Sequence, residues 1–330
     1  MNRFAAALPV LLPVLLPVLL AVLLIPAQAG AKSLYVAGAN GVPLAVTDVG
    51  DENADPGQPE ILFLHGIGQG KESFFPQLEA EDLRGYRMVA FDLRGHGMSG
   101  KPWTEADYTD PALWAGDVSA VISATGLKKP VLVAWSYGAL VAADYIRTFG
   151  TGGLAGLVLI SSLGGLVPPP SPPSPSLNAD PVYPPELLRA RALMRVPDLA
   201  AQREASGLIV PMLVKDGAAP GWLDQAARLA LMVPPYAQPH LRKHGASNAD
   251  LLPGIDVPLL FVHGSFEASF SQETINRLLA VAPCARTSAY PAQGHSPFAE
   301  APARFNAELL AFVAAASAGC ARPSQPRTNK

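Results

Sequence analysis

One serine of this chain stands where its side chain could attack a carbonyl carbon. Ser136 follows a short apolar run at residues 131–135, with small residues two positions before it (Ala134) and two positions after it (Gly138). A strand that turns sharply into a helix holds its central residue strained and exposed, and this geometry needs small neighbours at those positions. The pattern predicts that Ser136 is a nucleophile, although Ala134 replaces the more usual glycine. The alternative is an incidental serine between a buried strand and a helix.

A nucleophilic serine needs a base and an acid. Among the six histidines, His295 is the one in a loop after the last expected strand. Glu267 follows the expected strand at residues 257–262, where a carboxylate would reach the imidazole from the side away from the serine. Asp256 fails this test because it precedes that strand. Ser136, Glu267 and His295 thus come in the order nucleophile, acid and base, which is one of the known orders of a catalytic triad.

A glycine-rich segment, H-G-I-G-Q-G-K at residues 65–71, follows the apolar run at 61–64. Two nucleotide-binding motifs fail on spacing. The motif G-x-G-x-x-G would need glycine in place of Lys71, and a phosphate-binding loop would need serine or threonine in place of Glu72. We interpret the segment as a backbone loop that presents an N–H group to a developing oxyanion. His65 is expected to orient this loop as a structural residue.

A second turn, D-L-R-G-H-G-M-S-G-K-P at residues 92–102, contains residue types that could form a catalytic cluster. We favour a structural role, in which Asp92 and Arg94 hold the turn. Its glycines would provide the unusual backbone angles.

Alternating strands and helices would position these residues. The helical segments expected in the core lie at residues 110–125, 137–149 and 303–316, and the eight expected strands at 33–36, 42–49, 61–64, 87–91, 131–135, 154–160, 257–262 and 285–290. Such alternation is typical of a mostly parallel sheet with helices on both faces. Sheets of this kind carry their sites at the carboxyl ends of the strands, where Ser136 is expected.

Residues 167–251 interrupt this alternation. They begin with a Pro/Ser-rich stretch, P-P-P-S-P-P-S-P-S, and continue as irregular helical sequence rich in Leu and Met. We expect a surface connection and then a helical cap whose apolar side chains border a pocket for an acyl or alcohol group. The alternative is that these side chains pack the cap's own small core. The core domain would then comprise residues 30–166 and 252–318, and residues 319–330 would form a disordered tail.

The first 29 residues have the pattern of a signal peptide. Arg3 precedes an apolar run, and Ala-Gln-Ala at 27–29 is a small-x-small cleavage site. An uncleaved membrane anchor is the alternative, but three prolines within the run weigh against a regular helix. We expect export to the periplasm or the medium, with membrane contact only if the leader stays uncleaved.

Charge and cysteine content narrow the choice of partners and compartment. The net charge is −3 and no Lys/Arg run with interleaved aromatic residues occurs, so nothing supports nucleic-acid binding. Cys284 directly precedes an expected strand, and Cys320 follows the last expected helix. Because an antiparallel covering helix returns to the start of its strand, the two cysteines of an exported chain are expected to form a disulfide. Two buried free thiols are the alternative.

Five motifs in this order resemble the α/β-hydrolase family over residues 33–316. They are F-L-H-G-I-G at 63–68, F-D-L-R-G-H-G-M-S-G-K-P at 91–102, A-W-S-Y-G at 134–138, F-V-H-G-S-F-E at 261–267 and G-H-S-P-F at 294–298. The set is similar to the branch that holds esterases, lactonases and cofactor-free haloperoxidases.

The resemblance implies a mostly parallel eight-stranded sheet flanked by helices, with an inserted helical cap. It also implies an oxyanion hole formed by the backbone N–H groups of Ile67 and Tyr137. Glu267 departs from the aspartate of most relatives, and Ala134 departs from the usual glycine. Serine rather than aspartate at position 136 argues against dehalogenase and epoxide hydrolase chemistry, which needs a carboxylate nucleophile.

We therefore expect an exported serine hydrolase that acts on small or medium carboxylic esters through an acyl-enzyme. Its partner would be a small-molecule ester or lactone, and the chemistry needs neither a metal nor an organic cofactor. Lactone hydrolysis and peroxide-dependent perhydrolysis remain alternatives within the same chemistry. A non-catalytic binding protein on the same fold is the alternative of another class, and a complete triad disfavours it.

Overall fold

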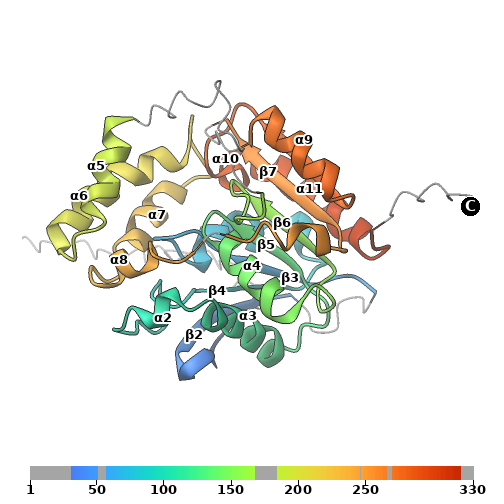
Figure 1. Cartoon of the computed structure of the whole chain (residues 1–330), viewed down its shortest axis with the longest axis horizontal. Coiled ribbons are helices and arrows are strands. Elements are labelled where there is room, and N and C mark those ends of the chain that lie inside the picture. Colours follow the sequence, from blue (N-terminus) through green and yellow to red (C-terminus); the bar gives the residue numbers. More distant parts are fainter. Residues whose placement is uncertain (1–30, 51–56, 168–183, 246, 266–269, 321–330) are drawn as a thin grey trace, which may run out of the picture.

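A computed structural model describes residues 31–50, 57–167, 184–245, 247–265 and 270–320. An eight-stranded sheet forms its centre, in the order β1-β2-β4-β3-β5-β6-β7-β8 (Figure 1). The strands are β1 (Lys32–Ala37), β2 (Pro43–Val49), β3 (Ile61–Leu64), β4 (Met88–Phe91), β5 (Val131–Trp135), β6 (Gly156–Ile160), β7 (Leu259–Gly264) and β8 (Ala285–Tyr290). Only the pairs that include β2 are antiparallel. The mostly parallel eight-stranded sheet is confirmed.

The central strands are buried along their whole length. Every residue of β3, β4, β5 and β6 is buried, and these strands are continuous apolar runs. This composition is typical of parallel strands covered by helices on both faces. The two edge strands, β1 and β8, carry exposed residues instead.

Helices cover the two faces of the sheet. Residues of α3, α4 and α9 belong to the apolar cluster on one face, and residues of α1, α10 and α11 to the cluster on the other. The helices of the core are α1 (Phe75–Leu78), α2 (Ala106–Thr109), α3 (Pro111–Thr125), α4 (Gly138–Phe149), α9 (Gln272–Val281), α10 (Pro297–Glu300) and α11 (Pro302–Ala316). Short 3-10 turns occur at η1 (Ala39–Gly41), η2 (Lys71–Phe74), η3 (Glu81–Leu83), η4 (Val210–Leu213) and η5 (Leu252–Gly254).

Four helices lie between β6 and β7 along the chain and form a lobe beside the sheet (Figure 1). They are α5 (Pro185–Leu193), α6 (Leu199–Ile209), α7 (Trp222–Ala230) and α8 (Ala237–Leu241). Part of this lobe packs its own small core, which includes Met194. Trp222 instead joins the main apolar core, and its indole N–H donates a hydrogen bond to the carbonyl oxygen of Ser73 at 2.8 Å. The lobe is therefore anchored to the core domain by its third helix.

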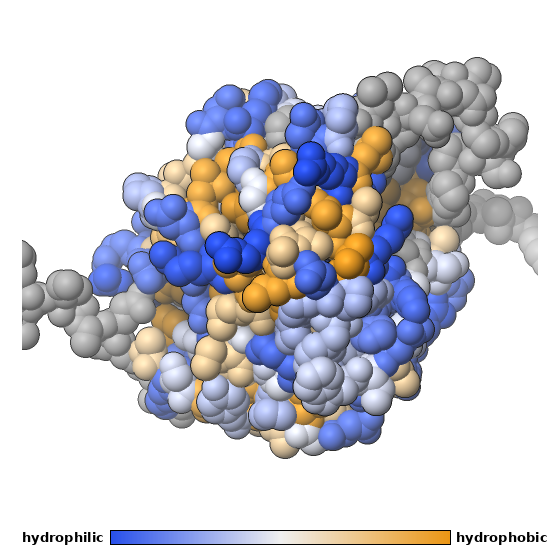
Figure 2. Space-filling view, turned by 90° about the vertical axis from the view of Figure 1, so that its left-hand side faces the viewer, coloured by the Kyte–Doolittle hydropathy of each residue, from blue (hydrophilic) through white to orange (hydrophobic). Residues whose placement is uncertain are grey.

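The outer surface of the lobe carries apolar side chains. Seen from the side of α5 and α6, apolar and polar residues are intermingled (Figure 2). The large exposed apolar residues of the lobe are Leu188, Val196, Leu199 and Leu231.

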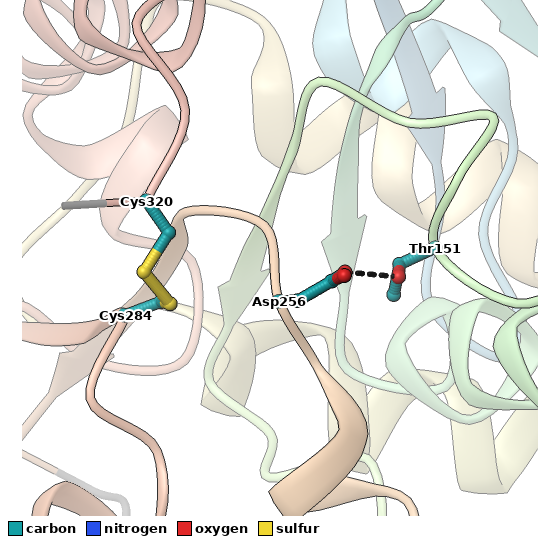
Figure 3. Close-up of a disulfide and its surroundings, with 4 residues drawn as sticks. All are labelled: Thr151, Asp256, Cys284 and Cys320. Carbon is teal, nitrogen blue, oxygen red and sulfur yellow. Dashed lines mark hydrogen bonds between the residues drawn. A yellow bond between two sulfur atoms is a disulfide. The ribbon is translucent and has the colours of Figure 1, made fainter. Parts of the chain in front are cut away.

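A disulfide joins Cys284 to Cys320, with their Cα atoms 5.5 Å apart (Figure 3). It links the start of β8 to the end of α11. Nearby, the hydroxyl of Thr151 donates a hydrogen bond of 2.5 Å to Asp256 (Figure 3). Asp256 thus has a structural partner at the end of the strands opposite to the one where Ser136 lies.

Several expected features lie outside the described residues, namely the leader at 1–29, most of the Pro/Ser-rich connection and the tail beyond Cys320. Among the helices that the structure describes, none combines the length and apolar character needed to cross a bilayer.

Candidate active site

Ser136 occupies the turn between β5 and α4 and has a backbone φ of 53°. A positive φ is uncommon for a residue with a side chain and stores strain, so it persists only where the surroundings enforce it. One restraint is visible here, since the N–H group of Ser136 donates a hydrogen bond of 2.8 Å to the carbonyl oxygen of Ile160, at the end of β6. The geometry matches the strained strand-to-helix turn that the motif predicted.

Close backbone approach explains the small residues around this turn. A Cβ atom on Gly138 would lie 2.4 Å from the carbonyl oxygen of Leu64, and one on Gly66 would lie 3.3 Å from the Cβ of Ser136. The loop after β3 and the start of α4 are therefore in direct contact. Ala134 lies inside β5, fully buried in the apolar core, where a methyl group is accommodated.

His295 lies in the loop between β8 and α10, half-buried. Its carbonyl oxygen accepts a hydrogen bond of 2.9 Å from Nε1 of Trp135, and the two rings are 5.8 Å apart. Trp135 directly precedes Ser136, so this bond ties the histidine loop to the strand that carries the serine. Residues 160 positions apart along the chain are thereby brought to the same edge of the sheet.

Glu267 lies outside the described residues, so its role as the acid stays a prediction. The residues that precede it lie against the loop of His295. Ser265, directly after β7, donates both its N–H (2.7 Å) and its hydroxyl (2.8 Å) to the carbonyl oxygen of Gln293. A Cβ atom on Gly264 would lie 1.7 Å from the carbonyl oxygen of Gly294, which allows only glycine there. The end of β7 therefore contacts the loop that carries His295.

The glycine-rich loop after β3 is held by a buried histidine. Nε2 of His65 accepts a hydrogen bond of 2.9 Å from the N–H of Leu93, and Nδ1 lies 2.8 Å from the carbonyl oxygen of Gly66. Since Nε2 is an acceptor, the proton is on Nδ1 and donates to Gly66. Burial lowers the pKa of His65 to about 3, so the ring stays neutral. This agrees with the structural role expected for His65.

Asp92 connects the same loop to the turn after β4. Its carboxylate accepts hydrogen bonds of 2.8 Å from the N–H groups of Lys71 and Met98. Arg94 forms a fully buried bidentate pair with Asp117 of α3, at 2.7 Å for both bonds. Both residues hold backbone turns and neither reaches toward Ser136 through a hydrogen bond in the described structure. The structural reading of this motif is supported.

Ile67 and Tyr137, the two expected oxyanion donors, lie on the two segments that meet at the serine. Ile67 is half-buried against the apolar core, within the glycine-rich loop. Tyr137 directly precedes the first residue of α4, and the first N–H groups of a helix have no partner within it. Its ring packs edge-on against Trp114 at 5.4 Å, and burial raises the pKa of its hydroxyl well above the ordinary value. The side chain is thus part of the buried core, and the role of the backbone N–H as an oxyanion donor stays a prediction.

The sequence analysis assigned no role to two residues at this site, Trp135 and Glu300. Trp135 stands next to the serine, but nothing in its position along the chain indicates a hydrogen bond to His295. Glu300, the last residue of α10, binds the backbone on either side of His295. The only local feature of the sequence that could have indicated the contact of Glu300 is a carboxylate five residues after the histidine, in a helix that begins with proline.

Comparisons with known proteins agree with this arrangement. The "Alpha/beta hydrolase family" matches residues 61–308. The crystal structure of a "putative aryl esterase" from Burkholderia cenocepacia superposes with a TM-score of 0.74 and 30% sequence identity, covering 87% of this chain and 100% of that chain. The esterase RhEst1 from Rhodococcus sp. ECU1013 gives a TM-score of 0.70 and 27% identity, over 86% and 98% of the two chains.

The bifunctional esterase/perhydrolase DCH of Acinetobacter calcoaceticus is 34% identical over 133 residues, which are 40% of this chain and 46% of that protein. The match spans less than half of the length of the first curated relatives.

Proposed function

Because the chain belongs to the α/β-hydrolase family, we propose that it is a serine hydrolase that cleaves carboxylic esters of small or medium size. One observation carries the proposal. Ser136 has a left-handed backbone at the turn from β5 to α4, and the adjacent Trp135 is hydrogen-bonded to the backbone of His295. This arrangement supports the proposal, because it brings the proposed nucleophile and the proposed base to the carboxyl edge of one sheet.

The proposed reaction has two halves. Oγ of Ser136 attacks the ester carbonyl carbon while His295 accepts the hydroxyl proton, and the resulting tetrahedral intermediate expels the alcohol, which takes that proton. Water then attacks the acyl-enzyme with the help of the same histidine, and the acid leaves. Glu267 would hold the imidazole in the correct tautomer and stabilise its protonated form. Neither half needs a metal or an organic cofactor.

The oxyanion of each tetrahedral intermediate would be bound by the backbone N–H groups of Ile67 and Tyr137. Preorganised N–H donors stabilise this charge at little reorganisation cost, and the loss of one typically lowers kcat by about 10² to 10³. The buried hydrogen bonds of His65 and Asp92 support this role, because they hold the glycine-rich loop in one conformation.

The substrate class rests on the esterases among the relatives and on the helical lobe. The names of the structural relatives describe an aryl esterase and an esterase. The lobe is rich in apolar residues, which favours an apolar acyl or alcohol group. Perhydrolysis, in which peroxide replaces water at the acyl-enzyme, is a second candidate, supported by the name of the relative DCH.

Export is part of the proposal. The signal-peptide pattern of residues 1–29 and the disulfide between Cys284 and Cys320 support a periplasmic or secreted location. A leader that is not cleaved would instead leave the protein anchored to the membrane.

A fluorophosphonate that carries a reporter group tests the central claim. It should label wild-type protein at Ser136, and Ser136→Ala should abolish labelling while retaining the fold by circular dichroism. The expected fall in ester turnover is about 10⁴ to 10⁶ in kcat. Ser161 is a matched control, because it also has a positive φ (51°) and follows the neighbouring strand β6. Ser161→Ala should keep its labelling, and a wild-type protein that is not labelled would favour a non-catalytic binding protein.

A further inference from the structure

The carboxylate of Glu300 binds three backbone N–H groups. Gly294 donates to both of its oxygens, at 2.8 and 2.9 Å, and Ser296 donates to one of them at 3.2 Å. Lys215, in the segment between η4 and α7 of the lobe, donates its N–H at 2.8 Å. Two of the three donors flank His295, one on each side. Among the described residues, the hydrogen bonds that Glu300 accepts come from backbone N–H groups, and two of these groups lie next to the proposed catalytic base.

The peptide unit between His295 and Ser296 is held from both sides. Its N–H donates to Glu300, and its C=O accepts the indole N–H of Trp135. In a trans peptide these two groups point in opposite directions, so Glu300 and Trp135 together fix the plane of the unit. Because the Cα of His295 belongs to this plane, the two bonds restrict where the imidazole can lie relative to Ser136.

We propose that Glu300 is a positioning residue for His295, a role that rests on the proposed serine hydrolase function. Its carboxylate holds the histidine loop in the conformation in which the imidazole reaches the serine hydroxyl. The bond to Lys215 extends the same contact to the lobe, and a backbone bond of 2.8 Å from Ala219 to Ala299 lies beside it. Glu300 therefore links the proposed base to the segment that borders the lobe.

A carboxylate is suited to this role because it only accepts hydrogen bonds. Its two oxygens offer about four acceptor positions, and the four contacts described here use them. In Glu300→Gln, one oxygen becomes an NH₂ group that faces N–H donors. The loop would lose at least one bond and meet a repulsive contact, while side-chain size stays the same.

Glu308 provides a matched control. It lies on α11, and its carboxylate accepts a hydrogen bond of 2.7 Å from the hydroxyl of Tyr290. Tyr290 is the last residue of β8, so Glu308 supports the same strand without touching the loop around His295. A general loss of stability near β8 should thus occur in both Glu300→Gln and Glu308→Gln, whereas misplacement of the histidine should occur only in the first.

The experiment measures hydrolysis of a p-nitrophenyl ester by the full chain, with kcat expressed per active site titrated by the fluorophosphonate. Titration removes any contribution from unfolded protein. Glu300→Gln should lower kcat per site about 10- to 100-fold with KM within about threefold of wild type, because misplacement of a catalytic group by about 1 Å has effects of this size. Glu308→Gln should retain the wild-type kcat. The acidic limb of the pH profile of kcat/KM should shift in Glu300→Gln alone, since it reports on the histidine.

Glu300→Asp serves as a second variant, because it keeps the charge but is shorter by one methylene. It should lower kcat per site less than Glu300→Gln, and it keeps the test decisive if the glutamine variant does not fold. An unchanged kcat per site and an unchanged pH profile in either folded variant would overturn the role of Glu300. If the wild-type protein is not labelled and does not hydrolyse esters, the proposed function itself fails, which is a different outcome.

Discussion

Nε2 of His244 lies 2.6 Å from Oδ2 of Asp144, and both side chains are buried. His244 follows α8 of the lobe, and Asp144 belongs to α4, the helix that begins directly after Ser136 and Tyr137. Trp114 of α3 stacks on the imidazole, with ring centres 5.4 Å apart. This contact therefore ties the end of the lobe to the helix that presents the proposed nucleophile.

Removal of the His244 side chain should destabilise the protein strongly. In His244→Ala, Asp144 would stay buried without its partner, and the loss of one member of a buried pair typically lowers the free energy of unfolding by about 3 to 5 kcal/mol. Arg147 of the same helix forms an exposed pair with Asp250, which lies just before η5, so Asp250→Asn should change the free energy of unfolding much less. Urea unfolding followed by circular dichroism measures both. Equal effects in the two variants would contradict a structural role for the buried pair.

Gly138→Ala should prevent correct closure of the turn after the serine. Its Cβ would lie 2.4 Å from the backbone of Leu64, a contact that only backbone movement relieves. We expect a severe loss of soluble protein or of fluorophosphonate labelling. Gly207→Ala, inside α6 with no heavy atom within 4 Å of the added Cβ, should be neutral or stabilising by up to about 1 kcal/mol. Normal labelling of Gly138→Ala would show that the turn is less constrained than the contacts indicate.

Acid should destabilise the protein through two of its buried histidines, His65 and His96. Burial lowers the pKa of His65 and of His96 from 6.5 to about 3. Between these values the unfolded chain binds protons that the folded chain does not, so the free energy of unfolding falls as the pH is lowered from about 6.5 toward 3. Each histidine contributes a slope of up to about 1.4 kcal/mol per pH unit.

Urea titrations at pH 7, 6, 5 and 4 measure this slope. His96→Gln should reduce the slope by nearly the contribution of one proton, which is about 1.4 kcal/mol per pH unit. The difference between the two proteins therefore reports on His96 and not on the carboxylates that also titrate in acid. The same slope in wild type and His96→Gln would mean that His96 is protonated in the folded protein.

Reduction of the disulfide between Cys284 and Cys320 should lower the melting temperature without lowering ester turnover. The bridge spans a sequence separation of 36 residues, and closing a loop of this length contributes about 3 to 4 kcal/mol in the chain-entropy model. It lies at the start of β8, whereas the loop of His295 follows the end of that strand. Thermal unfolding with and without reductant measures the first effect, and Cys284→Ser/Cys320→Ser should behave as the reduced protein. A loss of kcat in the folded double variant would contradict this separation.

The sequence by itself determined the fold and the turn that carries Ser136. Apolar runs of four to six residues, small residues around the serine and helical periodicity after it depend on neighbours close along the chain, and such local patterns survive in the folded protein. The boundaries of the elements differ by a few residues from those expected. β7 extends to Gly264 and not to residue 262, because its register is set by pairing with β8, where Gly264 lies opposite Tyr290. In addition, no helix was predicted from the sequence at the position of α9.

Only the tertiary structure decided which distant groups meet. The indole of Trp135 reaches His295, Glu300 binds the backbone on both sides of that histidine, and His244 finds Asp144 across 100 residues of chain. No regular spacing along the sequence predicts these contacts, because each depends on how two separately formed elements pack against each other. A hydrogen bond forms only when donor and acceptor are about 3 Å apart. Small differences in how two elements pack therefore decide whether it forms, and the sequence alone does not specify them.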